Sequence, residues 1–175
     1  LVFLAFGVCL AVPELRLGFS AYLQHLFQGM DLTDGAGNLS PLLLLANNLR
    51  ACAVTMLYGL IPFVRLPALA LGVNAVLLGG LAACYAATDT TMLLYAASLL
   101  PHGIFELPAL ILAFSMGLYI CGHLTRRCRR DPAALPLGAC LGLAARLLVF
   151  LLLPLLILAA LTESYVTPLA AGLFL

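Results

Sequence analysis

The sequence predicts an all-α polytopic membrane bundle, with about five spanning segments, an amphipathic interfacial helix, and a re-entrant or half-helix before residue 101. Of its 175 residues, 65% are apolar and 9% are charged, and the mean hydropathy is +1.17. Soluble domains do not have this composition. The apolar residues form runs long enough to cross about 30 Å of hydrocarbon as helices. We expect a single membrane domain over residues 1–175.

The first segments differ in character. Residues 1–12 are apolar but lack the basic start and small-residue cleavage site of a signal peptide, so we expect the end of a first transmembrane helix whose beginning lies outside this sequence. Apolar residues at helical spacing over 19–27 predict the amphipathic helix. Residues 29–40 are rich in Asp, Gly and Asn and predict an aqueous loop, because the closing glutamate of a calcium-binding loop is missing.

Ser40 should cap the next span, which has Pro at its first helical position and runs to Pro62. It contains Asn47, Asn48 and Arg50. Arginine at the centre of a span costs about 2.5–3.5 kcal/mol on insertion scales, so its guanidinium should face a carboxylate, water or headgroups. Two interpretations stay open. Either Arg50 reaches lipid phosphate while the asparagines bond a neighbouring helix, or all three line a polar site.

Residues 68–87 predict a further span. Gly72, Gly79 and Gly80 give it small faces that allow close contact with another helix. Asn74, within this span, should hydrogen-bond a neighbouring helix or line the same polar site.

Residues 91–100, capped by Asp89 or Thr90, would rise only about 15 Å as a helix, half of a bilayer. We therefore predict a re-entrant or interfacial half-helix followed by a break at Pro101. The run 103–124 would rise about 33 Å and cross the membrane.

His102 and Glu106 lie four residues apart at the start of this crossing helix, on one face. The unpaired N–H groups and positive dipole end of a helix start favour a carboxylate there. Pro108 removes a backbone hydrogen bond one turn later, so we expect an early bend. Further along, every fourth residue is small, which predicts tight packing through Ala109, Ala113 and Gly117.

Four arginines at 126, 127, 129 and 130 follow this helix and predict its cytoplasmic end. Arg65 should lie on the same side, which places the 14–40 segment and the helix mouth at His102 outside. Residues 136–161 predict the last span, with a small Gly138-x-x-x-Gly142 face and a kink at Pro154.

The decapeptide LPHGIFELPA at 100–109 resembles the signature of the stage II sporulation protein M family of integral membrane proteins. The stretches Asn47-Asn48-Leu49-Arg50 and Glu163-x-x-Val166-Thr167-Pro168 are similar to two further parts of that family. Together they extend the resemblance over most of the chain. In spore formers the family member is a membrane partner of a cell-wall-degrading machine that drives engulfment of the forespore. The resemblance therefore implies membrane or extracytoplasmic protein partners.

Polar side chains from separate segments should meet near the outer boundary, because a buried unpaired charge costs several kcal/mol. Arg50 is the favoured partner of Glu106, with Glu163 the second candidate for that arginine. The expected intramembrane polar site consists of Asn47, Asn48, Arg50, Asn74, His102, Glu106, Glu163 and Thr167.

We expect no catalytic centre, metal or cofactor. No HExxH, GxSxG, P-loop or GxGxxG motif occurs, and the pair His102 and Glu106 alone supplies at most two metal ligands. The spacing of Cys121, His123 and Cys128 matches no zinc template, and the six cysteines should pack as small apolar residues. The net charge of +1 and the lack of a basic stripe argue against nucleic-acid binding.

Two functions stay open. The first is a noncatalytic integral membrane scaffold or partner subunit, similar to the sporulation engulfment protein that anchors a cell-wall-remodelling complex, multi-pass in the inner or cytoplasmic cell membrane. Its small-residue faces make a homodimer a reasonable expectation. The alternative is a small-solute or ion transporter or channel with a polar site of His102, Glu106, Arg50 and Glu163, although no internal repeat supports alternating access.

Overall fold

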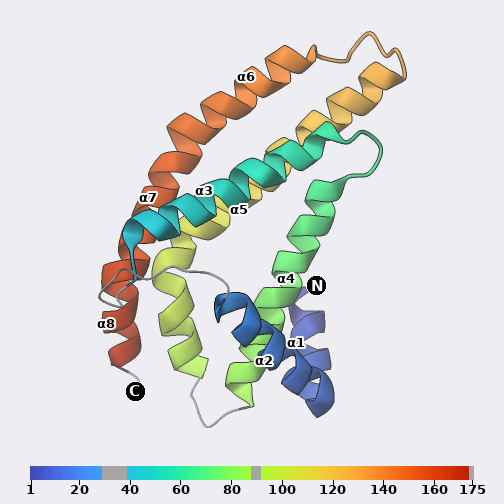
Figure 1. Ribbon diagram of the computed structural model, residues 1–175. Helices are drawn as coiled ribbons and strands as arrows, with labels where there is room; N and C mark the ends of the chain where they lie inside the picture. The colour runs from blue at the N-terminus through green and yellow to red at the C-terminus, as the bar shows by residue number, and fades with distance from the viewer. Residues whose placement is uncertain (29–38, 88–91, 174–175) are drawn as a thin grey trace.

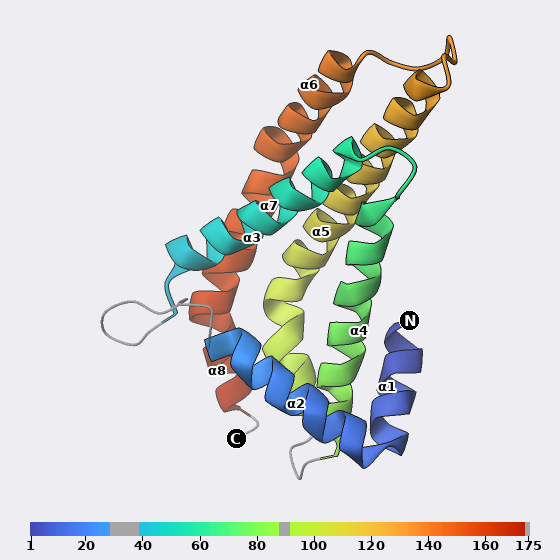
Figure 2. The ribbon, with the colours of Figure 1, turned by 45° about the vertical axis from the view of Figure 1, so that its right-hand side comes forward.

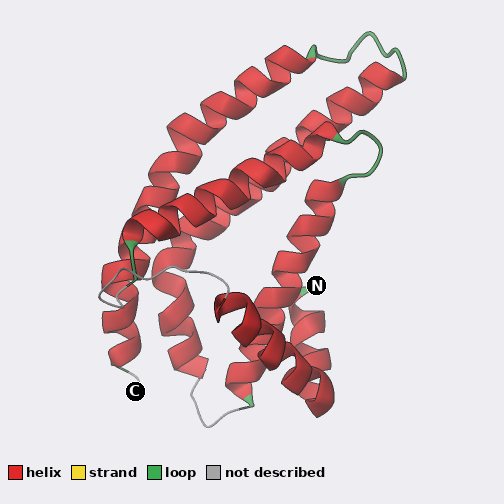
Figure 3. Cartoon of the chain, in the orientation of Figure 1, coloured by secondary structure: helices red, strands yellow, loops and turns green. Residues whose placement is uncertain are grey.

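The computed structural model describes residues 1–28, 39–87 and 92–173 as helices joined by short connections (Figures 1 and 3). Most of the predicted loop at 29–40 and the predicted cap at Asp89 or Thr90 lie outside the described residues. The described helices are α1 (Val2–Ala11), α2 (Pro13–Gln28), α3 (Pro41–Leu57), α4 (Leu66–Ala86), α5 (Met92–Cys128), α6 (Leu137–Leu147), α7 (Leu153–Leu161) and α8 (Thr167–Gly172). Three shorter turns are the 3-10 turn η1 (Tyr58–Leu60) and the π turns η2 (Leu148–Leu152) and η3 (Thr162–Val166).

Among the described residues, four helical stretches are long and apolar enough to cross a membrane: Pro41–Leu60, Leu66–Ala86, Met92–Cys128 and Leu137–Gly172. A fifth candidate is the pair α1 and α2, which meet at a bend of 116°. The predicted all-α polytopic bundle is therefore confirmed. α2 runs across the bundle over α4 (Figure 2).

Small residues allow the N-terminal helices to approach α4 closely. A Cβ on Gly79 would meet the backbone of α1 at Val2 and Phe6, and one on Gly80 would meet the ring of Phe19 on α2. The predicted close contact at these two glycines is therefore present. Asn74, on the same helix, is exposed and does not reach a neighbour, because its Nδ2 donates to the Ala70 carbonyl 2.9 Å away.

The centre of the bundle is where α5 packs against α3 and α7. Ala109 and Ala113 are completely buried there. A Cβ on Gly117 would lie 2.7 Å from the Thr55 carbonyl oxygen and 2.8 Å from Pro67 Cγ. The predicted small face of α5 is thus its packing surface. The predicted small face at Gly138 and Gly142 does not pack against another described helix, since a Cβ at either position would meet nothing within 4 Å.

One expectation was wrong: the segment before Pro101 is not a separate half-helix. α5 is a single helix of 37 residues with Pro101 and Pro108 inside it, and Figure 2 shows that it bends along its length. Proline removes one backbone hydrogen bond and clashes with the carbonyl four residues earlier, which bends a helix without necessarily ending it. The first part is held against α4, where Tyr95 Oη donates to the Leu78 carbonyl at 3.2 Å.

The last span contains two π turns, and each ends two residues before a proline. η2 precedes Pro154 and η3 precedes Pro168. A proline ring clashes with the carbonyl of the residue four positions earlier, which is Phe150 in the first case and Ser164 in the second. Both residues lie in the middle of a π turn, so the wider turn makes room for the ring. A π turn therefore precedes Pro154, where the sequence predicts a kink.

The connection that contains Arg65 and the one that contains Arg129 and Arg130 lie at one end of the bundle, opposite α8 (Figure 2). The Phe63 N–H donates to Thr125 Oγ1 at 3.0 Å, and the guanidinium of Arg129 lies 5.8 Å from the centre of the Phe63 ring. Arg65 therefore shares an end with the arginines that follow α5, as the predicted topology requires.

Candidate functional site

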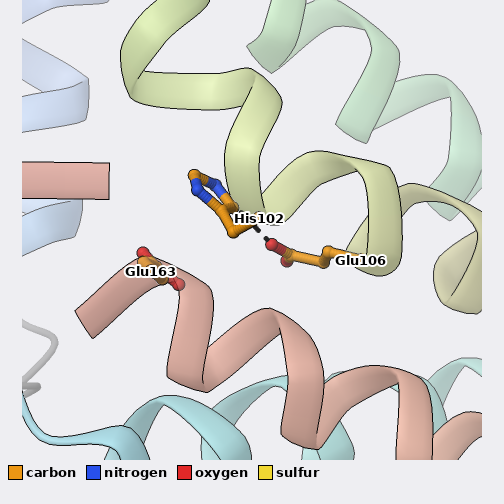
Figure 4. A group of neighbouring side chains, drawn as sticks. All are labelled: His102, Glu106 and Glu163. Atoms are coloured by element: carbon orange, nitrogen blue, oxygen red, sulfur yellow. Dashed lines mark ion pairs between the residues drawn. The ribbon is translucent and has the colours of Figure 1, made fainter. Parts of the chain in front are cut away.

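Three ionisable side chains from two distant parts of the chain meet beside the bend of α5. His102 and Glu106 project from α5, and Glu163 faces them from η3 in the last span (Figure 4). One potential ligand atom from each residue lies within 4.8 Å of the others, and all three side chains are half-buried. We call these three residues the His-Glu-Glu cluster. The structure thus brings together residues that the sequence placed level with one another.

Helical spacing sets the first half of the cluster. Four residues separate His102 from Glu106, so their side chains lie on one face of α5. The distance from His102 Nε2 to Glu106 Oε2 is 3.9 Å. The side chain of His102 is 12% exposed and that of Glu106 is 23% exposed, so water has limited access to them. This distance is too long for a hydrogen bond.

Thr167 fixes the orientation of the imidazole. Its Oγ1 lies 3.3 Å from His102 Nδ1 and also donates to the Thr162 carbonyl at 3.3 Å. A hydroxyl has one proton to donate, so when Thr167 donates to the Thr162 carbonyl, His102 Nδ1–H is the donor of the remaining contact. In the neutral imidazole, Nε2 then carries the lone pair, and Nε2 is the atom that faces Glu106.

Arg50 is not the partner of Glu106, and this expectation was wrong. Arg50 is exposed, and within the described residues neither Glu106 nor Glu163 lies within ion-pair distance of an arginine. The reason is the rotation of α3 about its axis. The buried side of α3 includes Asn48 and Cys52. Arg50 comes two residues after Asn48, which turns it about 200° around the helix axis and places it on the opposite, exposed side.

The remaining predicted residues lie apart from the His-Glu-Glu cluster. Asn48 is buried and Asn47 half-buried on α3, and among the described residues neither hydrogen-bonds the cluster. Asn74, on α4, bonds its own helix. Of the eight predicted residues, the structure gathers His102, Glu106, Glu163 and Thr167.

Sequence reasoning missed the third potential metal ligand. It counted only His102 and Glu106, although it placed Glu163 at the same level. It also missed Ser164, whose Oγ is buried and has no hydrogen-bond partner within the described residues. The tight spacing of Glu163, Thr167 and Pro168 was the available signal, because it places an acid and a hydroxyl one turn apart before a proline.

Two grooves on the bundle are apolar and do not include the cluster. One, of about 240 Å³, lies between α3 and α7 and is lined by Pro41, Leu42, Leu45, Ile157, Ala160 and Leu161. The other, of about 180 Å³, lies between α3, α5 and α6 and is lined by Ala53, Met56, Leu57, Ile120, Leu141, Ala144, Ala145 and Leu148.

A known protein family matches the chain over almost its whole length. A model of the family described as stage II sporulation protein M matches residues 1–168. No curated protein and no solved structure matched the chain. The match includes the LPHGIFELPA decapeptide, Glu163 and Thr167. With multiple membrane-spanning helices and a family match over almost its whole length, the chain belongs to the stage II sporulation protein M family of membrane proteins.

Proposed function

We propose that the protein is a noncatalytic membrane scaffold or partner subunit, similar to the sporulation engulfment protein that anchors a cell-wall-remodelling complex. This proposal rests on the contacts that the polar side chains of the last span make with those of α5. His102 contacts both Glu106 and Thr167, and Thr167 contacts Thr162. These contacts join α5 to α8 and stabilise one arrangement of the helices, which is what a scaffold requires.

The apolar character of the two grooves supports the same proposal. Both lie between helices and are lined by aliphatic side chains and Met, which suits lipid or an apolar helix better than a hydrated solute. The partners would be membrane or extracytoplasmic proteins. They would meet the end of the bundle that bears the His-Glu-Glu cluster, since the arginine-rich end faces the cytoplasm in a multi-pass protein of the cell membrane.

The alternative, a small-solute or ion transporter or channel, is favoured by one observation. The ionisable cluster lies where α5 contains two prolines and where the last span has a π turn. Irregular helices beside charged groups are how many transporters build substrate sites, and π turns are frequent at functional sites.

A flux measurement separates the two functions. Purified protein in liposomes with an internal pH-sensitive dye is compared with His102→Ala and with His25→Ala, which changes an exposed histidine on α2. A scaffold gives no flux that depends on His102. Proton or ion flux that disappears in His102→Ala but persists in His25→Ala contradicts the scaffold and supports the transporter.

A crosslinking experiment gives the scaffold a positive test. A photoreactive residue replaces Tyr165, which is exposed beside the cluster, or Phe150, which is exposed further along the same span. We expect position 165 to capture a cell-wall-remodelling protein in intact cells, and position 150 to capture none. Absence of such a product at position 165 counts against the proposal.

A further inference from the structure

We propose that His102, Glu106 and Glu163 bind one divalent metal ion, which joins α5 to the last span. The proposal goes beyond the scaffold function and does not depend on it. Its basis is the geometry of the His-Glu-Glu cluster (Figure 4), in which a nitrogen and two carboxyl oxygens from two parts of the chain lie within 4.8 Å of one another.

The spacing of the ligand atoms fits a bridging ion better than a shared proton. A hydrogen bond between nitrogen and oxygen needs about 2.7–3.2 Å, whereas His102 Nε2 and Glu106 Oε2 are 3.9 Å apart. Zn²⁺ lies about 2.0–2.2 Å from imidazole nitrogen or carboxylate oxygen, so two ligand atoms on a tetrahedral ion are about 3.3–3.6 Å apart. The largest separation in the cluster is within 4.8 Å. The ligand atoms therefore have to come closer by at most about 1.5 Å, which rotation of the glutamate side chains can supply.

The charges in the cluster also favour a dication. Two carboxyl groups face each other in a half-buried site, and within the described residues no arginine pairs with either of them. Charged groups with little access to water need a compensating partner. One divalent ion balances two carboxylates and leaves the site neutral. Glu163 lies at the right place to share the ion with Glu106, which explains why two acids come together here.

Thr167 prepares the histidine for this role. Metal-bound histidines usually donate their second N–H to an oxygen, which fixes the tautomer and the direction of the ring. Thr167 Oγ1 occupies that position at 3.3 Å from His102 Nδ1 and is itself held by the Thr162 carbonyl. With the proton on Nδ1, the nitrogen left free to bind a metal is Nε2, which lies 3.9 Å from Glu106 Oε2.

The donor set selects the class of ion. One imidazole and two carboxylates suit Zn²⁺, Mn²⁺ or Fe²⁺, since imidazole binds transition metals and carboxylate oxygen suits the harder ions. Calcium needs six to eight oxygen ligands, typically at about 2.3–2.6 Å, and this cluster offers a nitrogen and two side-chain carboxyl groups. Three protein ligands leave at least one coordination position for water.

Binding of Mn²⁺ to the purified full chain in detergent tests the proposal. Mn²⁺ has little affinity for thiolates, so the free Cys128, which is exposed, does not interfere. Electron paramagnetic resonance of free Mn²⁺ gives the stoichiometry, and competition with Zn²⁺ gives its relative affinity. We expect one ion per chain in the wild type and binding weakened more than about tenfold in Glu163→Gln and His102→Ala.

Two matched controls change the same residue types at exposed positions, Glu14→Gln and His25→Ala, and both should bind Mn²⁺ as the wild type does. The melting temperature without metal shows that each variant is folded, and the metal should raise it in the wild type and the controls only. If Glu163→Gln does not fold, Thr167→Val provides the comparison. Equal Mn²⁺ binding by wild type and cluster variants, or no binding of Mn²⁺ or Zn²⁺ at all, overturns the proposal. Neither result alters the flux or crosslinking outcomes that test the scaffold.

Discussion

Gly59 and Gly117 bring two helical segments into backbone contact. A Cβ added to Gly59 would collide with the carbonyl oxygen of Gly117. In the other direction, a Cβ on Gly117 would lie 2.7 Å from the Thr55 carbonyl oxygen. The end of α3 and the middle of α5 therefore meet without any side chain between them.

We expect Gly117→Ala to destabilise the protein, because backbone atoms cannot move aside as the end of a side chain can. Overpacking of this kind costs about 1–3 kcal/mol. Thermal unfolding in detergent measures it. The matched control is Gly122→Ala in the same helix, where a Cβ meets nothing within 4 Å. Equal melting temperatures for Gly117→Ala and the wild type would show that the close contact does not form.

Removal of the hydroxyl that holds His102 should weaken metal binding without removing a metal ligand. Loss of a group that orients a metal-bound histidine typically costs 10–100-fold in affinity, so we expect an effect of about that size from Thr167→Val. Thr162→Val is the control, because its hydroxyl bonds the Leu158 carbonyl of its own helix at 2.7 Å. If both variants bind Mn²⁺ equally well, the hydroxyl of Thr167 does not orient the imidazole.

The π turn before Pro168 should position Glu163. In Pro168→Ala the ring no longer clashes with the preceding turn, so residues 162–166 can close into an ordinary α turn, which rotates Glu163 away from His102. We expect weaker Mn²⁺ binding. Pro154→Ala makes the same change at η2, away from the cluster, and should bind as the wild type does. Unchanged Mn²⁺ affinity in Pro168→Ala would show that the π turn does not position Glu163.

Cysteine labelling checks the orientation of the bundle. In a background without native cysteines, Glu14→Cys on α2 should react with a membrane-impermeant maleimide in intact cells, whereas Arg129→Cys should react only after lysis. The expectation rests on the arginines gathered at one end of the molecule. The reversed labelling pattern would place the His-Glu-Glu cluster on the cytoplasmic side.

Features that depend on spacing along one helix could be predicted from the sequence. Ala109 and Ala113 recur at the interval of a helical face, and they are buried as expected. His102 and Glu106 lie one turn apart for the same reason. The Ser40 cap also follows from local chemistry, since its Oγ accepts from the Leu43 N–H at 3.5 Å.

Features that depend on the rotation of one helix against another could not be predicted. α3 is apolar on most sides, so its sequence has no clear polar face to indicate which residues turn inward. The interpretation that placed Arg50 in a polar site within the bundle was therefore wrong, whereas Asn48 two positions earlier is buried. The path of α5 through its prolines was missed because the contact of Tyr95 with Leu78, which supports the helix there, joins segments that are separate in the sequence.

Because His102 and Thr167 are far apart along the chain, the ribosome synthesises them at clearly different times. They are 65 residues apart, so at about 5–20 residues per second the ribosome needs roughly 3–13 seconds to supply the second after the first. During most of that interval His102 and Glu106 exist without Glu163, which lies in the last span. The cluster can be complete only after the last span has been synthesised, so its assembly comes late in the folding of the chain.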